Sequence, residues 1–378
     1  MNIAGEWVRN LSGELMYQSF KPSALPPALE LTSDLIQKVV KANRKLTELD
    51  TIAKYIPNTA LFISMYVRKE ALISSQIEGT QCTLDDILDP DLEVNTNLEI
   101  SDVINYVKAT QFALNRLNEL PICNRLLREV HAVLLDNVRG EDKNPGEFRH
   151  SQNWIGPANC SLKEARYIPP NVEDMKKAME DLEKYLNEET EYDPLIRIAL
   201  VHYQFETIHP FLDGNGRVGR LLILLYLIEQ GLLENPVIYI SYFLKKNQIE
   251  YYDRMSEVRR TGNYEQWVTF FLEAVIAAAS DAVESIQTLT VLHHQNVIRL
   301  PKANRSKDTL RLVFDYIEQY PIIDIKHAAD VLELSYNTVS AAVKKLMSLG
   351  ILQETTNSAR NRVFAYEDYL RILRKDTI

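Results

Sequence analysis

One stretch of the chain must lie at the centre of whatever fold it adopts. Residues 217–231 are apolar on nearly every side of a helix, with the unbroken run Leu221 to Ile228 in their middle. A helix without a polar face is stable in water only when other elements surround it. The run is far shorter than the roughly 20 residues that cross a bilayer. It therefore predicts a buried core helix and no membrane segment.

Apolar residues recur at helical spacing over most of the remaining chain. The first thirty residues are expected to form an extended lead-in. Residues 146–170 mix aromatic residues with Gly, Pro, Asn and Ser, which is typical of a short hairpin or an ordered loop. The fold class is therefore mainly α. The expected helices cover residues 30–54, 58–77, 101–117, 124–137, 171–187, 193–207, 217–231, 247–260 and 263–290.

A second pattern begins after a polar linker near residue 300. Three helical segments, 309–319, 325–332 and 335–349, precede two short strands expected within 351–366. This order resembles a winged helix-turn-helix, with Ser335 suited to cap the third helix. We therefore divide the chain into an N-terminal helical region (1–110), a helical core (111–295) and a winged helix-turn-helix domain (296–378).

Charge and cysteine content limit the classes of partner. The net charge of -10 opposes broad nucleic-acid binding, so DNA contact is possible only locally. From Pro301 onward the chain has 12 Lys and Arg against 10 Asp and Glu, a weak basic excess that suits DNA or protein contacts equally. Candidate phosphate contacts there are Lys344, Lys345, Arg360 and Arg362. The three separate cysteines and the absence of a visible signal peptide favour a cytoplasmic protein.

The chemistry is concentrated in residues 209–220, HPFLDGNGRVGR, at the start of the core helix. Closely spaced glycines at a helix N-terminus let backbone N–H groups bind an anion such as phosphate. Arg217 and Arg220 lie on one helix face, where their guanidinium groups suit phosphate oxygens. Asp213 offers an oxygen ligand for Mg²⁺, and His209 is a base that titrates near pH 7. The spacing differs from that of a Walker loop.

Each of these features alone is usually structural. A Gly-Asn-Gly is usually a turn, a histidine is usually a satisfied core residue, and arginine pairs on helices are usually solvated. A purely structural turn does not need a base, an acid, three glycines and two arginines within twelve positions. The combination therefore favours a nucleotide site.

The string matches every fixed position of the pattern His-x-Phe-x-Asp/Glu-Gly-Asn-Gly-Arg-x-x-Arg and so resembles the Fic family. The preceding residues 200–208 also look like the helix that comes before the motif in that family. The resemblance implies a helical bundle with a hairpin flap, here within 111–295. It also implies transfer of AMP from ATP to a Tyr, Thr or Ser hydroxyl of a target protein, with release of pyrophosphate. Self-modification and a homodimer are further implications.

The resemblance also implies a role for each motif residue. His209 would be the catalytic base, Asp213 would hold Mg²⁺ on the ATP phosphates, and Arg220 would reach the γ-phosphate. Phe211 would anchor the loop in the core. The remaining residues expected at the nucleotide are Gly214, Asn215, Gly216, Arg217, Val218 and Gly219.

Two further segments resemble nucleotide-binding parts of the family. Residues 146–170 fall where the flap lies, and Arg166, Tyr167 and Ile168 resemble the part that covers the nucleotide; the alternative is a plain surface loop. Tyr251 resembles a residue on the adenine side of the site, although paired tyrosines on a helix are commonly core residues.

Residues 74–79, SSQIEG, fit the Ser/Thr-x-x-x-Glu-Gly/Asn pattern of autoinhibited Fic proteins. Glu78, with Ser74, would pair with Arg220 and occupy the position of the γ-phosphate. The alternative is an ordinary helix end with a solvated glutamate.

Two rival functions remain open at this point. The same loop could serve AMP removal or the transfer of another nucleotide or of phosphate. In a second alternative, the chain is a DNA-binding regulator whose helical core senses a nucleotide.

Overall fold

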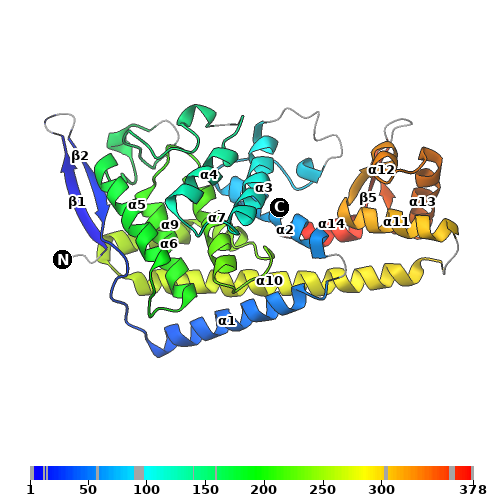
Figure 1. The fold of residues 1–378 in the computed structure, drawn as a ribbon, viewed down its shortest axis with the longest axis horizontal. Helices are drawn as coiled ribbons and strands as arrows, with labels where there is room; N and C mark the ends of the chain where they lie inside the picture. The colour runs from blue at the N-terminus through cyan, green and yellow to red at the C-terminus, as the bar shows by residue number, and fades with distance from the viewer. Residues whose placement is uncertain are drawn as a thin grey trace.

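The computed structural model of the chain describes residues 4–11, 13, 16–56, 59–88, 98–138, 140–157, 160–301, 305–356 and 362–375. It is mainly helical, which confirms the predicted fold class. Helices α1 to α10 form a bundle, and a smaller C-terminal unit lies at its far end (Figure 1). The helices of the bundle are α1 (Ser33–Ala53), α2 (Thr59–Ile77), α3 (Leu98–Arg116), α4 (Asn124–Leu134), α5 (Val172–Asn187), α6 (Pro194–Ile208), α7 (Asn215–Glu229), α8 (Ser241–Lys246), α9 (Gln248–Thr261) and α10 (Tyr264–Arg299).

The centre of the bundle is formed by α6 and α7, which pack against each other. Every residue of α6 from Leu195 onward is buried, and so is every residue of α7 up to Leu227. The side chain of Asp193 caps α6 by accepting the N–H of Leu195 at 2.8 Å, with Pro194 as the first helical residue. In the described part of the chain, neither these helices nor any other is long and apolar enough to span a membrane.

Helix α10 is the longest element and runs along one side of the whole molecule, with α1 packed against it (Figure 1). The sequence predicts an end near residue 290, but the helix continues to Arg299. Its last turns are held by the C-terminal unit, where Asn296 donates to the hydroxyl of Tyr366. Tertiary contact therefore extends the helix to Arg299, just before the polar segment expected to be a linker.

The first thirty residues differ from the expected extended lead-in. Strands β1 (Gly5–Asn10) and β2 (Tyr17–Pro22) form an antiparallel hairpin in which Trp7 pairs with Phe20. Phe20 is fully buried, and its N–H donates to the carbonyl of Ile168 at 3.0 Å. The hairpin therefore packs against the end of the 146–170 stretch.

Within 146–170, the described residues form an ordered loop with one isolated β-bridge, between Ile155 and Tyr167. A 3₁₀ turn over Leu162–Glu164 lies between the two bridge residues. The sequence left open a hairpin or an ordered loop, and the described residues are closer to the second.

The C-terminal unit contains the expected helices and strands in the expected order, with β3 and α14 in addition. Its three strands form an antiparallel sheet in the order β3-β5-β4. Helix α14 returns toward the bundle, where Arg374 donates to both oxygens of Asp85 at 2.8 and 2.9 Å. Arg360 lies outside the described residues. The elements are α11 (Arg305–Gln319), β3 (Ile322–Asp324), α12 (Ile325–Val331), α13 (Tyr336–Ser348), β4 (Gln353–Glu354), β5 (Val363–Ala365) and α14 (Glu367–Arg374).

Candidate active site

His209 ends α6 in a left-handed backbone conformation, with φ at 51° and ψ at 62°. A residue other than glycine keeps this conformation only when its surroundings hold it there. The backbone N–H of His209 donates to the carbonyl of Phe205 at 2.9 Å, and its own carbonyl accepts from Arg149 and Asn153 at 3.1 Å each. These bonds hold the turn that joins α6 to the loop before α7.

The imidazole of His209 has one defined tautomer. Its Nδ1 atom lies 3.3 Å from the carbonyl oxygen of Glu206, which can only accept a hydrogen bond, so Nδ1 carries the proton. Burial lowers the pKa of His209 to about 4, and the bond to the Glu206 carbonyl offsets only part of this effect. The ring is therefore neutral at pH 7, with the Nε2 lone pair able to accept a proton.

The loop between α6 and α7 is closed by Asn215. The side chain of Asn215 accepts the N–H of Phe211 and donates to its carbonyl, both at 2.8 Å. Gly214 has φ at 75° immediately before α7, a conformation that favours glycine. The loop thus presents the N-terminus of a long buried helix, where backbone N–H groups and the helix dipole favour an anion.

Asp213 is the one predicted metal ligand. Its carboxylate is 40% exposed, and Oδ1 accepts the N–H of Gly214 at 2.6 Å. Among the described residues, no group of three His, Cys, Asp or Glu side chains forms a metal site by itself. A single accessible carboxylate nevertheless fits Mg²⁺, which usually takes one or two carboxylates together with phosphate oxygens and water.

Arg220 is engaged by the two predicted inhibitory residues. It is 2% exposed, and its guanidinium bonds Glu78 at 2.6 Å, the hydroxyl of Ser74 at 2.8 Å and the carbonyl of Ser74 at 2.9 Å. Burial alone would raise the pKa of Glu78, but the attraction of Arg220 outweighs it and the pKa is lowered. The pair therefore remains charged at neutral pH.

Glu78 reaches across the first turn of α7, beside Gly216. A Cβ atom added to Gly216 would collide with Oε1 of Glu78 and lie 2.9 Å from Arg220. The glycine is therefore needed for this close approach. Arg217, which is 1% exposed, faces Asp102 at 3.4 Å and Asp213 at 3.9 Å.

Of the predicted cover residues, Tyr167 points into the core, and its hydroxyl donates to the carbonyl of Thr207 at 2.7 Å. The guanidinium of Arg259 lies 4.0 Å from the centre of its ring. Arg166 is exposed and Ile168 is half-buried. The two neighbours of Tyr167 are thus the ones that solvent reaches.

Tyr251 is 1% exposed, and its hydroxyl lies 2.8 Å from Nε2 of His202. The other ring nitrogen of His202 bonds the carbonyl of Gly219 at 3.0 Å. Tyr251 thus links α9 to the motif helix through the core. Its neighbour Tyr252 is only half-buried.

Two buried polar side chains that sequence reasoning did not single out tie the 146–170 stretch to the motif. Arg149 is 1% exposed and donates to the carbonyl of His209. Asn153 donates to the carbonyls of His209 and Phe211, at 3.1 and 2.8 Å. Their only signal in the sequence is their place in an irregular stretch rich in aromatic residues.

Glu206 was also missed. It is 8% exposed, and its Oε1 atom is buried without a hydrogen-bond partner among the described residues. Burial raises its pKa to about 7, although Arg220 acts in the opposite direction. A Cβ atom on Gly219 would collide with this carboxyl group. A glutamate inside a largely apolar helix was the available signal.

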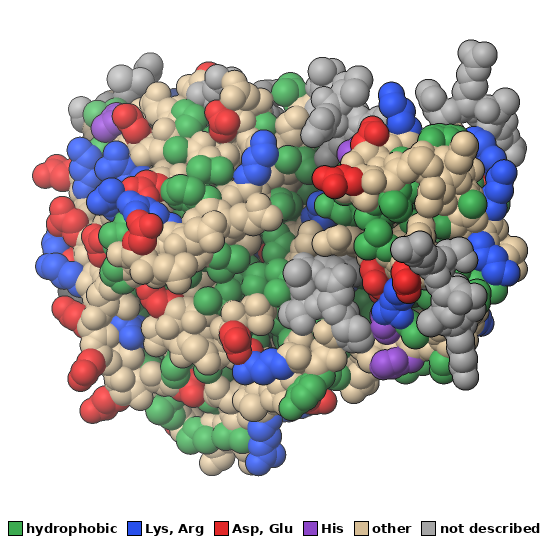
Figure 2. All heavy atoms as spheres, turned by 45° about the vertical axis from the view of Figure 1, so that its right-hand side comes forward, with side chains coloured by type: hydrophobic (Ala, Val, Ile, Leu, Met, Phe, Trp, Pro, Cys, Tyr) green, Lys and Arg blue, Asp and Glu red, His purple; other side chains and the backbone are tan. Residues whose placement is uncertain are grey.

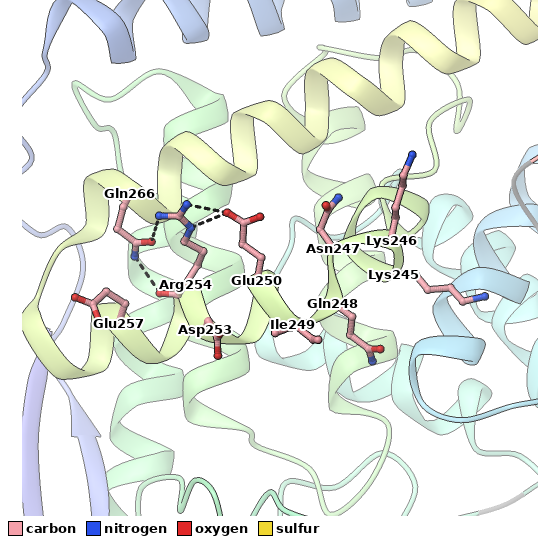
Figure 3. Close-up of a pocket in the computed structure, with 10 residues that line it drawn as sticks. All are labelled: Lys245, Lys246, Asn247, Gln248, Ile249, Glu250, Asp253, Arg254, Glu257 and Gln266. Carbon is pink, nitrogen blue, oxygen red and sulfur yellow. Dashed lines mark hydrogen bonds and ion pairs between the residues drawn. The ribbon is translucent and has the colours of Figure 1, made fainter.

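A separate groove of about 750 Å³ runs along the outer face of α9 (Figure 3). Its central cation, Arg254, is already paired with Glu250 at 2.7 Å and with Gln266 at 3.3 Å (Figure 3). None of its lining residues belongs to the motif. The groove therefore does not include the motif.

Comparison with known families finds two matches. Residues 36–115 match the Fic/DOC family N-terminal domain, and residues 121–227 match the Fic/DOC family domain. Among solved structures, a Fic family protein from Desulfovibrio desulfuricans G20 is 18% identical, with a TM-score of 0.59 over 90% of this chain and 98% of that one. A fragment of Fic-1 from C. elegans is 20% identical, with a TM-score of 0.51 over 68% and 74%. At these identities the likeness is one of fold.

Curated relatives carry the name Protein adenylyltransferase Fic. The one from Culex quinquefasciatus is 31% identical over 183 residues, which cover 48% of this chain and 32% of the relative. The one from Drosophila willistoni is 28% identical over 285 residues, which cover 68% and 52%. The chain thus spans about a third to a half of the length of these relatives. Both family domains and the fold agree with the motif geometry, and residues 36–115 and 121–227 form the two domains of the Fic/DOC family.

Proposed function

We propose that this chain is a protein adenylyltransferase that transfers AMP from ATP to a Tyr, Thr or Ser hydroxyl of a target protein. Relatives named Protein adenylyltransferase Fic support this activity. The observation that carries the proposal is a neutral His209 held directly before the N-terminus of α7. A base and an anion site then lie next to each other, as transfer of a phosphate-bearing group to a hydroxyl requires.

In the proposed reaction, the target hydroxyl oxygen attacks the α-phosphorus of ATP while its proton passes to Nε2 of His209. The bond from the α-phosphorus to the pyrophosphate oxygen breaks, and pyrophosphate leaves. Backbone N–H groups of Gly214, Asn215 and Gly216 would hold the phosphates at the start of α7. Arg217 would neutralise charge that develops on them.

Asp213 would hold Mg²⁺, which supplies charge neutralisation on the phosphates when bound. Arg166 and Ile168 are exposed enough to cover the nucleotide, while Tyr167 would support them from below. The contact proposed for Tyr251 would be made by the ring of Tyr252, because the hydroxyl of Tyr251 is bonded to His202.

We further propose that Glu78 holds the enzyme inactive. The contact of Glu78 with Arg220 uses the guanidinium that the γ-phosphate of ATP needs, and Ser74 binds the same group. Because attraction to Arg220 lowers the pKa of Glu78, the block would persist throughout the neutral pH range. ATP could then bind only in an unproductive position.

Incubation with ATP labelled at the α- or the γ-phosphorus tests the proposal. Glu78→Gly is expected to increase protein labelling from α-labelled ATP by about tenfold or more, because Arg220 is released. Adding His209→Ala should reduce that labelling by about a hundredfold or more, the usual contribution of a general base. Gln81→Gly, an exposed change three residues beyond Glu78, is the matched control and should leave labelling unchanged.

The other outcomes separate the rival functions. Label that arrives only from γ-labelled ATP would mean phosphate transfer. Loss of AMP from a previously labelled protein, dependent on Glu78, would mean AMP removal. Equal labelling in wild type and Glu78→Gly would overturn the inhibitory role of Glu78. The transfer activity would then be tested by whether His209→Ala reduces the labelling.

We also propose that the C-terminal unit is a winged helix that contacts DNA or a protein, including a second copy in a homodimer. Helix α13 exposes Tyr336, Asn337, Lys344 and Lys345, and Ser335 caps it by accepting the N–H of Thr338 at 3.2 Å. Arg362 is already paired with Glu354. Acidic and basic side chains are interspersed on the face shown in Figure 2. This mixture favours a protein contact over DNA.

Fluorescence anisotropy with a random duplex at low salt tests DNA binding by this unit. Binding that weakens steeply with salt, and that Lys344→Ala with Lys345→Ala reduces, would establish a DNA role. Unchanged anisotropy would exclude DNA binding and leave a protein as the proposed partner of this unit. Sedimentation at several protein concentrations then tests the homodimer.

A further inference from the structure

His131 lies on α4, directly beneath the motif loop, and is fully buried. Its ring stacks on that of Phe211, with the centroids 3.8 Å apart and the planes at 7°. A Cβ atom on Gly214 would touch the same ring at 3.5 Å. The imidazole therefore forms a flat floor under the loop that holds Asp213.

Both ring nitrogens of His131 are used, and by different segments. The N–H of Gly146 donates to Nδ1 at 2.9 Å, so Nδ1 has no proton. The proton is then on Nε2, which donates to the carbonyl of Asp213 at 3.0 Å. Only a neutral imidazole in this one tautomer can make both bonds.

The two segments that His131 joins are the start of the 146–170 stretch and the motif. Gly146, with φ at 81°, begins the proposed flap, and Asp213 lies 67 positions later in the numbering. The carbonyl of Asp213 is held by His131, while its carboxylate is held by the N–H of Gly214 at 2.6 Å. With both ends of the residue held, the direction of the carboxylate is set.

We propose that His131 is a positioning residue that orients the Asp213 carboxylate and couples it to the start of the flap. The proposal rests on the proposed function, because it takes Asp213 as the residue that would hold Mg²⁺. A histidine with only a packing role would support stability and nothing else. The bridging tautomer instead predicts that each bond has its own effect.

Two substitutions of similar size separate the two bonds. In His131→Asn, the side-chain oxygen replaces Nδ1 and keeps the Gly146 contact, but nothing reaches the Asp213 carbonyl. In His131→Gln, the amide group replaces Nε2 and keeps the Asp213 contact at the cost of the Gly146 contact. Leu127→Ala, a fully buried apolar change one turn earlier on α4, is the control for lost packing.

Isothermal titration with ATP, with and without Mg²⁺, in the Glu78→Gly background measures the Asp213 contact without requiring any transfer. His131→Asn should reduce the gain in affinity due to Mg²⁺ by about tenfold, whereas His131→Gln and Leu127→Ala should keep it. Hydrogen exchange over residues 146–157 should accelerate in His131→Gln and remain slow in His131→Asn.

The proposal is overturned if His131→Asn, His131→Gln and Leu127→Ala lower the melting temperature but behave alike in both measurements. Transfer activity provides an independent comparison. If Glu78→Gly shows no AMP transfer while the Mg²⁺ gain and the exchange pattern follow the two bonds, the proposed activity fails and the positioning role stands.

Discussion

The bundle and the C-terminal unit differ in how many ionisable side chains they bury. The C-terminal unit keeps its ion pairs at the surface, and among its described residues Glu318 is the one buried ionisable carboxylate. The bundle buries many ionisable side chains, and most of them lie on or against α6 and α7. They are Lys69, Glu70, Asp102, His131, Arg149, Arg197, His202, Glu206, Arg217 and Arg220.

This difference points to the bundle as the location of the functional site. Removing a charge from water is costly and often contributes nothing net to stability. Buried charges are therefore kept mainly where their chemistry is needed, and perturbed pKa values gather at such sites. The bundle should thus gain stability when a buried carboxylate that lacks a hydrogen-bond partner is neutralised, whereas the C-terminal unit should respond only through ordinary contacts.

The largest stability effect is expected at Glu206. Its pKa is raised from 4.5 to about 7 by burial, so the folded protein binds this proton more tightly than the unfolded chain does. The stabilising contribution of this proton is fully present below pH 4.5 and is lost as the pH rises to about 7. Glu206→Gln should therefore match wild type at pH 4.5 and exceed it by up to about 3 kcal/mol at pH 8.

Denaturant unfolding at several pH values measures this difference. The exposed change Glu189→Gln is the control and should follow wild type at every pH. A Glu206→Gln variant that is less stable than wild type at pH 8 would show that the carboxylate is stabilising, and the comparison between the two regions would lose its strongest case.

A smaller effect is expected where the two regions meet. His293 on α10 bonds the buried Glu318 of α11 through Nδ1 at 2.8 Å. Burial raises the pKa of Glu318, and His293 partly reverses the shift. His293→Ala should destabilise the protein by about 1–3 kcal/mol, because a buried acceptor loses its donor.

His293→Asn, whose amide can still donate to Glu318, is the matched variant and should recover most of the lost stability. Both variants, made in the Glu78→Gly background, should keep the AMP labelling of the parent. If labelling falls in parallel with stability, the C-terminal unit contributes to the active site and the two regions are not separate in function.

The smallest effect is expected at the surface of the C-terminal unit. Arg371 pairs with Asp368 at 3.3 Å, with exposed fractions of 70% and 44%. Exposed pairs contribute little, so Arg371→Ala should change the free energy of unfolding by less than about 0.5 kcal/mol. Thermal and denaturant unfolding measure the change, and a loss above about 1 kcal/mol would contradict the contrast drawn here.

Local patterns in the sequence predict most of the helices, because each depends on residues within a few turns. The exceptions depend on distant contacts. The β1–β2 hairpin was not predicted, since strand β2 is held by distant segments, including the carbonyl of Ile168, which accepts the N–H of Phe20. The end of α10 was placed too early because Asn296 is held by Tyr366, 70 positions away.

The sequence by itself determined which residues the motif contains. Residues 209–220 hold the proposed base, the helix start and the proposed metal ligand in one string, and a loop of this kind is a local structure. It also determined that the following helix is central, because a helix with no polar face must be surrounded.

Only the tertiary structure decided how that motif is held. Glu78 meets Arg220 across 142 positions, and His131 joins Gly146 to Asp213 from a third helix. No local pattern specifies such meetings, because they arise when separate helices pack and their buried polar groups must find partners. The sequence thus determined which residues the candidate site contains, and the packing of the helices decided which partners those residues bond.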